Sequence, residues 1–262
     1  GVVRMNLLKG LSLIGQPYRF NPSENLVTSH VGVLSNVEAL QWAIKAKQEG
    51  KIKYLAAGPN LVVLPSECDR ILESEAIDRV IVPSEWVKNK YIHVSPCLKL
   101  RIAMWPTGVD ETYWRPPRKP KRDLDFLVYN KNNEPELMKE IIAELTKRNL
   151  SYEIITYGGY SRPDYKRLLC RSKAILFLSW TEAAPIAIFE AWSCNVPTLA
   201  WDRGYWKYLD DETIQFPASS VPFLTKDCGL SFKDAGDFKE KLSRFMADIG
   251  RYKPRETILQ KY

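Results

Sequence analysis

Two glutamates, Glu182 and Glu190, are the residues of this sequence whose type and spacing most clearly indicate chemistry. Glu182 lies in a loop, residues 179–185, that follows a very apolar run, and Glu190 lies in the helical pattern that comes next. A carboxylate can accept hydrogen bonds from two hydroxyl groups, which makes it a natural clamp for a sugar. Both carboxylates can face one ligand that lies along the start of this helix, where backbone amides and the helix dipole also favour a phosphate.

The elements that must position these glutamates alternate between strand and helix patterns. We expect strands at residues 124–129, 151–157, 174–179 and 196–201, helices at residues 134–148, 163–170, 185–194 and 237–249, and a short polar segment at residues 254–262. Such alternation is typical of parallel βαβ units, here forming a doubly wound α/β sheet with helices on both faces. Ligands bind these sheets at the carboxyl ends of the strands, where the loop of Glu182 is expected to lie.

The first part of the chain shows the same alternation on a smaller scale. We expect a mostly buried helix at residues 2–14, helices at residues 36–50 and 85–92 with Asn36 and Ser84 as N-caps, and strands at residues 53–57, 79–82 and 99–104. A βα unit that begins at residue 2 needs a strand before it, so either that strand is missing from this chain or the first domain is unusually small. The pattern predicts two domains, residues 1–108 and 123–262.

Residues 109–122 are predicted to be an extended linker between these domains. Within them, residues 115–122 hold five cations, three prolines and no anion, so most of the net charge of +7 is local. Prolines lock φ and like charges repel, which favours an extended chain. A phosphate-contacting stripe, a nuclear localisation signal and a membrane-surface patch remain alternatives. Because the rest of the chain is nearly balanced in charge, we expect no nucleic-acid partner.

Three segments together resemble a known enzyme family. They are Leu178-Ser179-Trp180-Thr181-Glu182 through Glu190-Ala191-Trp192-Ser193-Cys194-Asn195-Val196-Pro197, Val82-Pro83-Ser84-Glu85-Trp86-Val87, and Pro106-Thr107-Gly108-Val109-Asp110. The first resembles the Glu-x7-Glu signature of glycosyltransferase family four, also called group 1 glycosyltransferases, and the others fall in that family's order. The resemblance implies the GT-B architecture, in which two Rossmann-like domains with parallel sheets face each other across a cleft; here the first domain is short.

The resemblance also implies roles for single residues. Glu182 would bind hydroxyls of the donor sugar and Glu190 the ribose hydroxyls of the nucleotide. Lys131, with Asn130 before it, would lie on the donor diphosphate, although the family's usual Arg and Lys-Gly pattern is absent. Structural alternatives stay open: a solvated carboxylate for Glu190, an acid favoured by the helix dipole for Glu182, and a solvated loop lysine for Lys131.

Glycines and one tyrosine add candidates for donor binding. Gly158, Gly159 and Tyr160 follow the predicted strand 151–157, where similar loops in the family shape the pocket for the base, and Tyr160 could stack on that base. A Gly-Gly pair at a strand end is as often plain turn chemistry. Gly1 sits where the family's first-domain phosphate loop would lie.

This chain departs from the family pattern in two places. The family often has glycine at the third position after the first glutamate, and this chain has Pro185, which lacks an N–H group. The amides of Ala184 and Ile186 would have to substitute. The first domain lacks an evident acceptor-side motif, and His30, after a possible strand, is its candidate catalytic contact; a structural or surface histidine is the alternative.

Metals, membranes and disulfides have little support in the sequence. Asp123 and Asp125 form an Asp-x-Asp pattern, but alternating charge at a strand edge explains it more simply than a metal site. We therefore expect no metal and no other cofactor. No run reaches the ~18 apolar residues that span a bilayer. Five scattered cysteines without a Cys-x-x-Cys pair fit a reducing cytoplasm, with contact at a membrane surface left open.

These observations lead to a functional hypothesis. The chain would be a retaining, metal-independent glycosyltransferase that moves a hexosyl or pentosyl group from a nucleotide-diphospho-sugar to a glycan, lipid-linked or protein acceptor. In that reading Lys131 and the start of the helix at residues 185–194 stabilise the leaving diphosphate. The alternatives are a GT-B epimerase or phosphorylase, or a non-catalytic module that binds a nucleotide-sugar or a nucleic acid.

Overall fold

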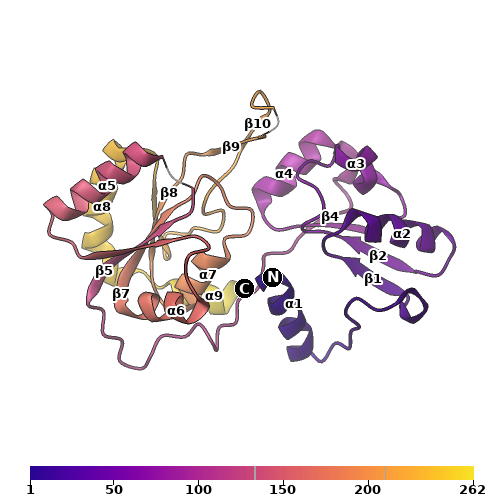
Figure 1. The fold of residues 1–262 in the computed structure, drawn as a ribbon, viewed down its shortest axis with the longest axis horizontal. Helices are drawn as coiled ribbons and strands as arrows, with labels where there is room; N and C mark the ends of the chain where they lie inside the picture. The colour runs from indigo at the N-terminus through magenta and orange to yellow at the C-terminus, as the bar shows by residue number, and fades with distance from the viewer. Residues whose placement is uncertain (133, 210) are drawn as a thin grey trace. The chain divides into compact units, whose positions relative to one another are not determined.

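The structure is a computed structural model that describes residues 1–132, 134–209 and 211–262. The chain divides into two compact units, Gly1–Gly108 and Val109–Tyr262, which are described separately (Figure 1). Each unit has a parallel sheet with helices packed against it, so the α/β class expected from the alternating pattern is confirmed.

The first unit has a parallel sheet in the order β1-β2-β3-β4. Its strands are β1 (His30–Val33), β2 (Tyr54–Ala57), β3 (Arg79–Val82) and β4 (Ile102–Met104), and its helices are α1 (Val2–Leu13), α2 (Val37–Gln48), the short α3 (Glu67–Arg70) and α4 (Glu85–Val94). Three 3₁₀ turns, Glu24–Leu26, Ile71–Glu73 and Pro96–Leu98, complete it. Neighbouring strands follow one another in the sequence and are parallel, so a crossover joins each to the next.

Two details of the first unit differ from the sequence expectations. The helix at the start of the chain forms, but none of its residues is buried, and Leu13 is 77% exposed. Its apolar residues are spread around the helix and leave it without one strongly apolar face. Ser84 occupies the N-cap position of α4 without a capping hydrogen bond, whereas Asn36 caps α2 by accepting from the Ala39 amide at 2.7 Å.

The second unit has a parallel sheet in the order β11-β8-β7-β5-β6. Its strands are β5 (Leu124–Asn130), β6 (Tyr152–Thr156), β7 (Ser172–Leu178), β8 (Thr198–Trp201) and β11 (Gly229–Phe232). A separate antiparallel hairpin, β9 (Tyr205–Lys207) and β10 (Gln215–Pro217), is inserted after β8. The helices are α5 (Pro135–Lys147), α6 (Arg162–Arg171), α7 (Ile186–Ser193), α8 (Ala235–Asp248) and α9 (Pro254–Lys261), with a 3₁₀ turn at Ile249–Arg251.

Helices cover both faces of this second sheet. Leu127 and Tyr129 of β5 point into a core shared with α6, α7 and α9, and the alternate residues Phe126 and Val128 point into a core shared with α5 and α8. Figure 1 shows these two groups of helices on opposite sides of the strands. Side chains of a strand alternate between the faces of a sheet, so strands buried on both faces must be apolar throughout. The predicted double winding is confirmed.

Residues 109–122 belong to the second unit, which differs from the extended linker expected from composition. Trp114 is fully buried in the core that α6 and α7 share. The guanidinium of Arg122 donates to the carbonyl oxygens of Leu169, Ser172 and Cys194, so it joins the ends of α6 and α7. Charge and proline content predicted solvation, and residues 117–121 are exposed. One large apolar residue and one well-placed guanidinium anchor the two ends of this stretch.

The end of the chain also differs from the expected short polar segment. Residues Pro254–Lys261 form α9, and Ile258 is buried against α7. Tyr262 adds ring contacts to Phe189 and Phe223, with ring centroids 4.8 and 5.5 Å away. The few apolar residues of this segment fall on one side of a helix, which is enough to dock it.

Candidate functional site

The connection order of the second sheet creates one position where neighbouring loops part. The chain leaves β5 for β6 on one side and then crosses to β7 on the other side of β5. In open parallel sheets of this order, ligands bind outside the carboxyl ends of the two strands at this switch point. Those ends are Asn130 of β5 and Leu178 of β7. Asn130-Lys131 and the loop of Glu182 therefore border the same crevice position.

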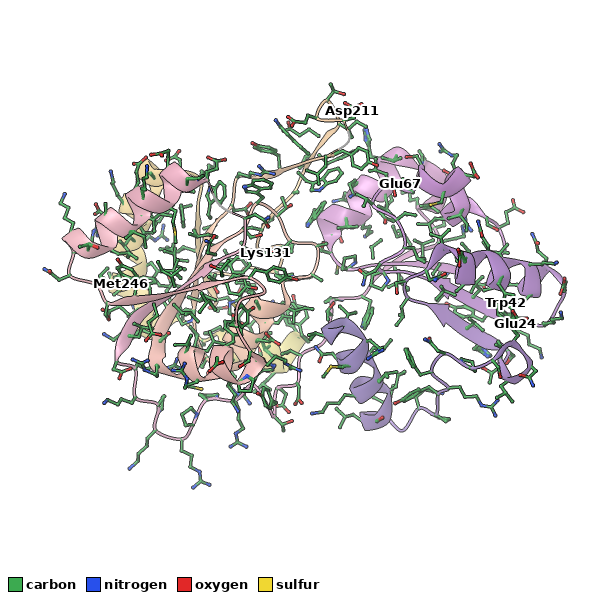
Figure 2. The ribbon with its side chains drawn as sticks, viewed as in Figure 1. Glu24, Trp42, Glu67, Lys131, Asp211 and Met246 are labelled. Atoms are coloured by element: carbon green, nitrogen blue, oxygen red, sulfur yellow. The ribbon has the colours of Figure 1, made fainter. Side chains whose placement is uncertain are left out.

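Lys131 and Glu182 form an ion pair across this switch point. The Lys131 Nζ lies 2.8 Å from Oε1 and 3.0 Å from Oε2 of Glu182, and it also lies 4.7 Å from the centre of the Tyr157 ring. Figure 2 labels Lys131 in the second unit. The Glu182 side chain is only 10% exposed and that of Lys131 26% exposed. A cation and a carboxylate are thus held together at the place where the sheet favours a ligand.

The backbone of three loops fixes this pair. The Lys131 amide donates to the carbonyl oxygen of Leu178 at 2.9 Å, and the Glu182 amide donates to that of Ser219 at 3.0 Å. Ser179 Oγ donates to Glu182 Oε1 at 2.8 Å. Ser219 Oγ in turn donates to Asp202, directly after β8. The loops after β5, β7 and β8 therefore hold the Glu182 carboxylate in one orientation.

Glu190 lies on α7 in a different environment. Glu190 is 6% exposed, and it forms a long ion pair with Arg162, whose Nη2 lies 3.7 Å from Oε1. Burial raises the pKa of the Glu190 carboxyl to about 8, and Arg162 only partly offsets this rise. Removing water disfavours the charged form of an acid, so Glu190 is mostly protonated at neutral pH. The solvated alternative weighed for Glu190 is wrong.

The predicted loop after β6 forms a turn beside a group of tyrosines. Gly158 has φ +82°, a left-handed conformation that favours glycine, and the Gly159 amide donates to the Thr156 carbonyl at 2.9 Å. The Tyr160 hydroxyl donates to that of Tyr129 at 2.9 Å. Its ring lies 5.2 Å from that of Tyr165, which packs in the core below. Tyr160 is thus half-buried among other tyrosines, which limits how its face can meet a base.

The start of α7 differs from the expected phosphate cradle. Pro185 is the N-cap residue, and the amide of Ile186 donates to the Ala184 carbonyl at 2.8 Å. The amides of Ile188 and Phe189 donate to the Pro185 carbonyl at 3.0 and 3.1 Å. The Ile186 amide predicted to substitute for the missing proline N–H is therefore already bonded within the turn. Proline and this tight turn leave the helix start with few amides for an anion.

His30 and Gly1 lie in the first unit. His30 opens β1 and does not follow a strand, so it lies at the amino end, opposite to the edge where parallel sheets bind ligands. Its ring stacks on Tyr54 with centroids 6.0 Å apart, and its Nδ1 lies 3.0 Å from Ser29 Oγ. Gly1 is the exposed N-cap residue of α1. The structural alternative for His30 agrees with these contacts.

Sequence reasoning missed two arginines near these residues. Arg162 approaches Glu190, and Arg203, the second residue after β8, lies 5.0 Å from the Trp180 ring centre and 4.5 Å from that of Tyr205. In the part of the chain that the structure describes, Nε of Arg203 and Nε1 of Trp180 are buried without a hydrogen-bond partner. The rule that ligands meet strand ends could have found Arg203, because it follows β8 as Lys131 follows β5.

The described residues hold neither a metal-type cluster of side chains nor a membrane-crossing helix. Among residues 1–132, 134–209 and 211–262, no three His, Cys, Asp or Glu side chains gather as a metal site would require. Asp123 and Asp125 instead pair with Arg171 at 3.0 Å and Lys173 at 2.7 Å. Within those same residues, no helix combines the length and apolar character that a membrane crossing needs.

Comparison with solved structures shows the fold. The lipopolysaccharide outer core galactosyltransferase WaaB, in its apo form, aligns with a TM-score of 0.58 and 16% identity over 100% of this chain and 75% of its own. Sucrose-phosphate synthase from Thermosynechococcus elongatus aligns with a TM-score of 0.57 and 14% identity, over 88% of this chain and 69% of its own. Anabaena HepE, in complex with UDP and glucose, aligns with a TM-score of 0.58 and 10% identity, over 89% of this chain and 74% of its own. WaaB and the synthase are GT-B glycosyltransferases, so this chain has the GT-B fold.

Sequence comparisons give no closer relation. No protein-family model matches the chain. No curated protein matches it either.

Proposed function

We propose that this chain is a glycosyltransferase that uses a nucleotide-diphospho-sugar and retains the configuration of the transferred sugar. The observation that carries the proposal is the Lys131–Glu182 ion pair at the β5/β7 switch point, with Glu190 on the helix that follows. The fold shared with WaaB and sucrose-phosphate synthase supports it. The complex of HepE with UDP and glucose supports a nucleotide-sugar as donor.

Lys131 is the residue that we place on the donor diphosphate. Without a ligand its charge is balanced by Glu182 at 2.8 Å. A diphosphate at this switch point brings competing negative charge, so Lys131 can turn to it with little change in position. Negative charge grows on the diphosphate as the bond to the sugar breaks, and a nearby cation stabilises that charge. Because α7 begins with Pro185 and a bonded Ile186 amide, the lysine carries more of this task than the helix start does.

Glu182 is the residue that we place on the donor sugar. An ionised carboxylate only accepts hydrogen bonds, which matches hydroxyl groups that donate. The bonds from Ser179 Oγ and Lys131 Nζ hold its carboxylate in place before any ligand arrives. Such preorganisation lowers the cost of orienting the sugar for reaction.

Glu190 is the residue that we place on the ribose hydroxyls. Its burial keeps it mostly protonated at neutral pH, when it can donate one hydrogen bond and accept another. Above about pH 8 it becomes an acceptor for both ribose hydroxyls. Ala184, Asn130, Gly158, Gly159 and Tyr160 border the same edge of the sheet and complete the donor side.

In the reaction, the bond between the anomeric carbon of the sugar and a diphosphate oxygen breaks. An acceptor hydroxyl forms the new bond on the same face of that carbon and gives up its proton. Lys131 supplies positive charge at the leaving group, so the step needs no metal ion. Glycan, lipid-linked and protein acceptors are all compatible with these residues, and a lipid-linked one would bring the protein to a cytoplasmic membrane surface.

A thermal-shift titration tests the donor. Adding UDP-, GDP- and dTDP-sugars at about 100 times the dissociation constant should raise stability by about 2.7 kcal/mol for the correct nucleotide. Lys131→Met should weaken this shift, and Lys139→Met, in an exposed pair with Glu136, should leave it unchanged. No shift with any nucleotide-sugar would overturn the proposed function. Stereochemistry is then read from the anomeric NMR signal of the product.

A further inference from the structure

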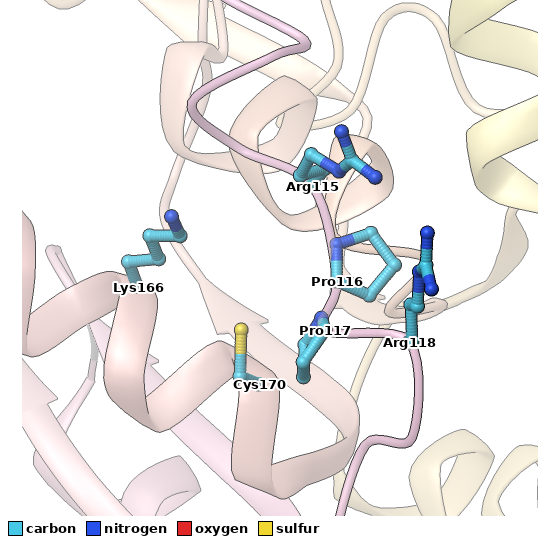
Figure 3. A pocket seen from close by; sticks show the side chains of 6 residues that line it. All are labelled: Arg115, Pro116, Pro117, Arg118, Lys166 and Cys170. Atoms are coloured by element: carbon cyan, nitrogen blue, oxygen red, sulfur yellow. The ribbon is translucent and has the colours of Figure 1, made fainter.

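A basic pocket lies away from the Lys131–Glu182 pair, on the segment that composition had suggested was a linker. It has a volume of about 330 Å³ and is lined by Arg115, Pro116, Pro117, Arg118, Lys166 and Cys170. Lys166 and Cys170 stand one turn apart on α6, and Figure 3 shows both side chains on the side of that helix that faces Pro116. The proposed glycosyl transfer leaves this pocket without a role.

A second cysteine lies behind the pocket. Cys194, the C-cap residue of α7, is fully buried, and its thiol is close enough to that of Cys170 for the two to influence each other's pKa. Arg122 holds the two helix ends together, since it donates to the carbonyl oxygens of Leu169, Ser172 and Cys194. The Cys194 thiol also lies 3.5 Å from the Trp114 carbonyl oxygen. One cysteine is therefore reachable from the pocket and the other contacts it from the protein interior.

The surroundings favour the ionised form of the outer cysteine. Contact with the Cys194 thiol, together with the charges of Arg122 and Lys166, lowers the pKa of Cys170 to about 6, although partial burial opposes this. The same contact and burial raise the pKa of Cys194. The thiolate is the reactive form of cysteine, and nearby cations commonly stabilise it. The two thiols thus differ in the way that an attacking and a resolving thiol must differ.

We propose that Cys170 is a thiol-modification site whose basic pocket takes anionic disulfides of the glutathione class, with Cys194 as the resolving thiol. The pocket is lined by Lys166, one helical turn before Cys170 on α6, and by Arg115 and Arg118. These cations attract the carboxylates of such a disulfide and give no advantage to a neutral one.

The chemistry balances in two exchanges. The Cys170 thiolate attacks one sulfur of the disulfide RS–SR, which forms Cys170–S–SR and releases RS⁻. Cys194 then loses its proton to solvent, and its thiolate attacks the Cys170 sulfur. This forms the Cys170–Cys194 disulfide and releases a second RS⁻, so the two cysteines are oxidised and RS–SR is reduced to two thiolates. Each bond that breaks is a disulfide, and no other oxidant takes part.

The first experiment measures alkylation of the intact chain by iodoacetamide between pH 5 and 9, with each cysteine followed by peptide mass spectrometry. At pH 6 about half of Cys170 is ionised, against about 0.3% of an ordinary thiol with a pKa of about 8.5. A thiolate of lower pKa is a weaker nucleophile than an ordinary one, so the larger ionised fraction of Cys170 raises its alkylation rate only about tenfold. We expect Cys170 to react about tenfold faster than exposed Cys68 and Cys97 at pH 6. A Cys170 profile that rises only near pH 8.5 would overturn the proposal.

The second experiment tests the class of ligand. We expect oxidised glutathione to modify Cys170 at least threefold faster than bis(2-hydroxyethyl) disulfide in dilute buffer, with the ratio falling in 0.5 M salt because salt screens charge. Lys166→Met should remove much of the difference, and Lys173→Met, in an ion pair with Asp125, is the matched control. Equal rates for the two disulfides would refute a basic pocket that selects anions.

The third measurement tests Cys194. After reaction with oxidised glutathione, the expected end product is a peptide pair joined through Cys170 and Cys194 with no glutathione attached. Cys194→Ala should stop at the glutathione adduct of Cys170. A stable adduct in the unaltered chain would refute the resolving role, and this outcome does not depend on whether the variant folds. None of these measurements requires a sugar donor, so their failure is distinguishable from failure of the proposed glycosyl transfer.

Discussion

Lys90 in the first unit and Glu190 in the second are opposite charges that are buried in the same way. Lys90 lies on α4 and is 5% exposed, and Glu190 lies on α7 and is 6% exposed. Burial lowers the pKa of Lys90 to about 8, with Glu67 opposing the shift, and it raises the pKa of Glu190 to about 8. Each unit therefore holds one helix side chain whose charged form is destabilised by lost water.

The contrast lies in what surrounds each charge. Glu190 lies near Tyr160 and Tyr165, on the helix that follows the Lys131–Glu182 pair at the switch point of its sheet. Lys90 lies against the rings of Trp86 and Tyr91, with its Nζ 5.2 and 5.8 Å from their centres. A cation over aromatic rings regains part of the energy lost on burial. For Glu190 we propose a ligand role instead, because the hydroxyl groups of a bound ribose would hydrogen-bond to its buried carboxyl.

The largest expected effect comes from the ion pair that distinguishes the second unit. Lys131→Met should lower turnover of the nucleotide-sugar by about 10²–10³-fold, since it removes the cation at the proposed leaving group. It also leaves the Glu182 carboxylate without its lysine partner at 2.8 Å and thus makes Glu182 more like Glu190. Steady-state rates of nucleoside diphosphate release measure the effect.

The control for this change is Lys139→Met, which removes a lysine from an exposed pair on α5. Such pairs contribute little, so the rate should stay the same. If Lys131→Met kept full turnover while Lys139→Met behaved as expected, the diphosphate would have to lie elsewhere.

Glu190→Gln should stabilise the protein and weaken nucleotide binding. The folded-state pKa of about 8 exceeds the ordinary 4.5, so the unfolded chain holds fewer protons between these values and the stability of the unaltered protein falls as pH rises. The loss of folding free energy caused by burying Glu190 is absent below pH 4.5, reaches about 3 kcal/mol at pH 7, and has its full value above pH 8. The gain in melting temperature from Glu190→Gln should therefore grow from pH 5 to pH 9.

Nucleotide affinity separates the ligand role of Glu190 from its effect on folding. In the unaltered chain, affinity should rise through about pH 8 as the carboxylate forms and accepts both ribose hydroxyls. Calorimetric titration of Glu190→Gln should show weaker binding without this rise. A variant that gained stability yet bound nucleotide as before would mean that the ribose lies elsewhere.

Lys90→Met should show the opposite pH dependence. The folded-state pKa of Lys90, about 8, lies below the ordinary 10.5. The loss of folding free energy from burying this lysine therefore has its full value below pH 8 and disappears as pH rises toward 10.5. At pH 7 the two costs are similar, about 3 kcal/mol each, before the contribution of the aromatic rings is counted. The stability gain from Lys90→Met in chemical denaturation should shrink between pH 7 and pH 10. A gain that grew over this range would contradict the comparison.

Part of this organisation was predictable from the sequence. Strand and helix patterns located most elements of both sheets, because period-2 and period-3.6 apolar spacing reflects which faces are buried. The outer strands β1 and β11 were not among the expected strands. The rule for strand ends then selected the loop of Glu182, and the family resemblance selected Lys131. Their contact spans 51 residues and depends on strand order, which local patterns do not encode. Arg162 beside Glu190 was missed for the same reason, since it approaches from a different helix.

Two other outcomes show where local rules fail. Composition indicated a solvated linker, and residues 117–121 are exposed, but it did not foresee that buried Trp114 and the three carbonyl contacts of Arg122 tie residues 109–122 to the second unit. His30 was expected after a strand, and it begins one. Residues on either side of His30 are equally β-type, so the pattern could not decide which end of the strand it occupies.

The smallest expected effect is at His30 in the first unit, where we expect almost no change in turnover or nucleotide affinity. His30 is exposed at the amino end of β1, with Ser29 at 3.0 Å and Tyr54 stacked on its ring. Surface substitutions away from special features usually change stability by less than about 0.5 kcal/mol. His30→Gln should therefore leave turnover within about twofold and nucleotide affinity unchanged, as measured by the same rate and titration assays. A tenfold loss of turnover with unchanged melting temperature would instead place an acceptor-side catalytic group in the first unit, and the division of roles between the two units would have to be redrawn.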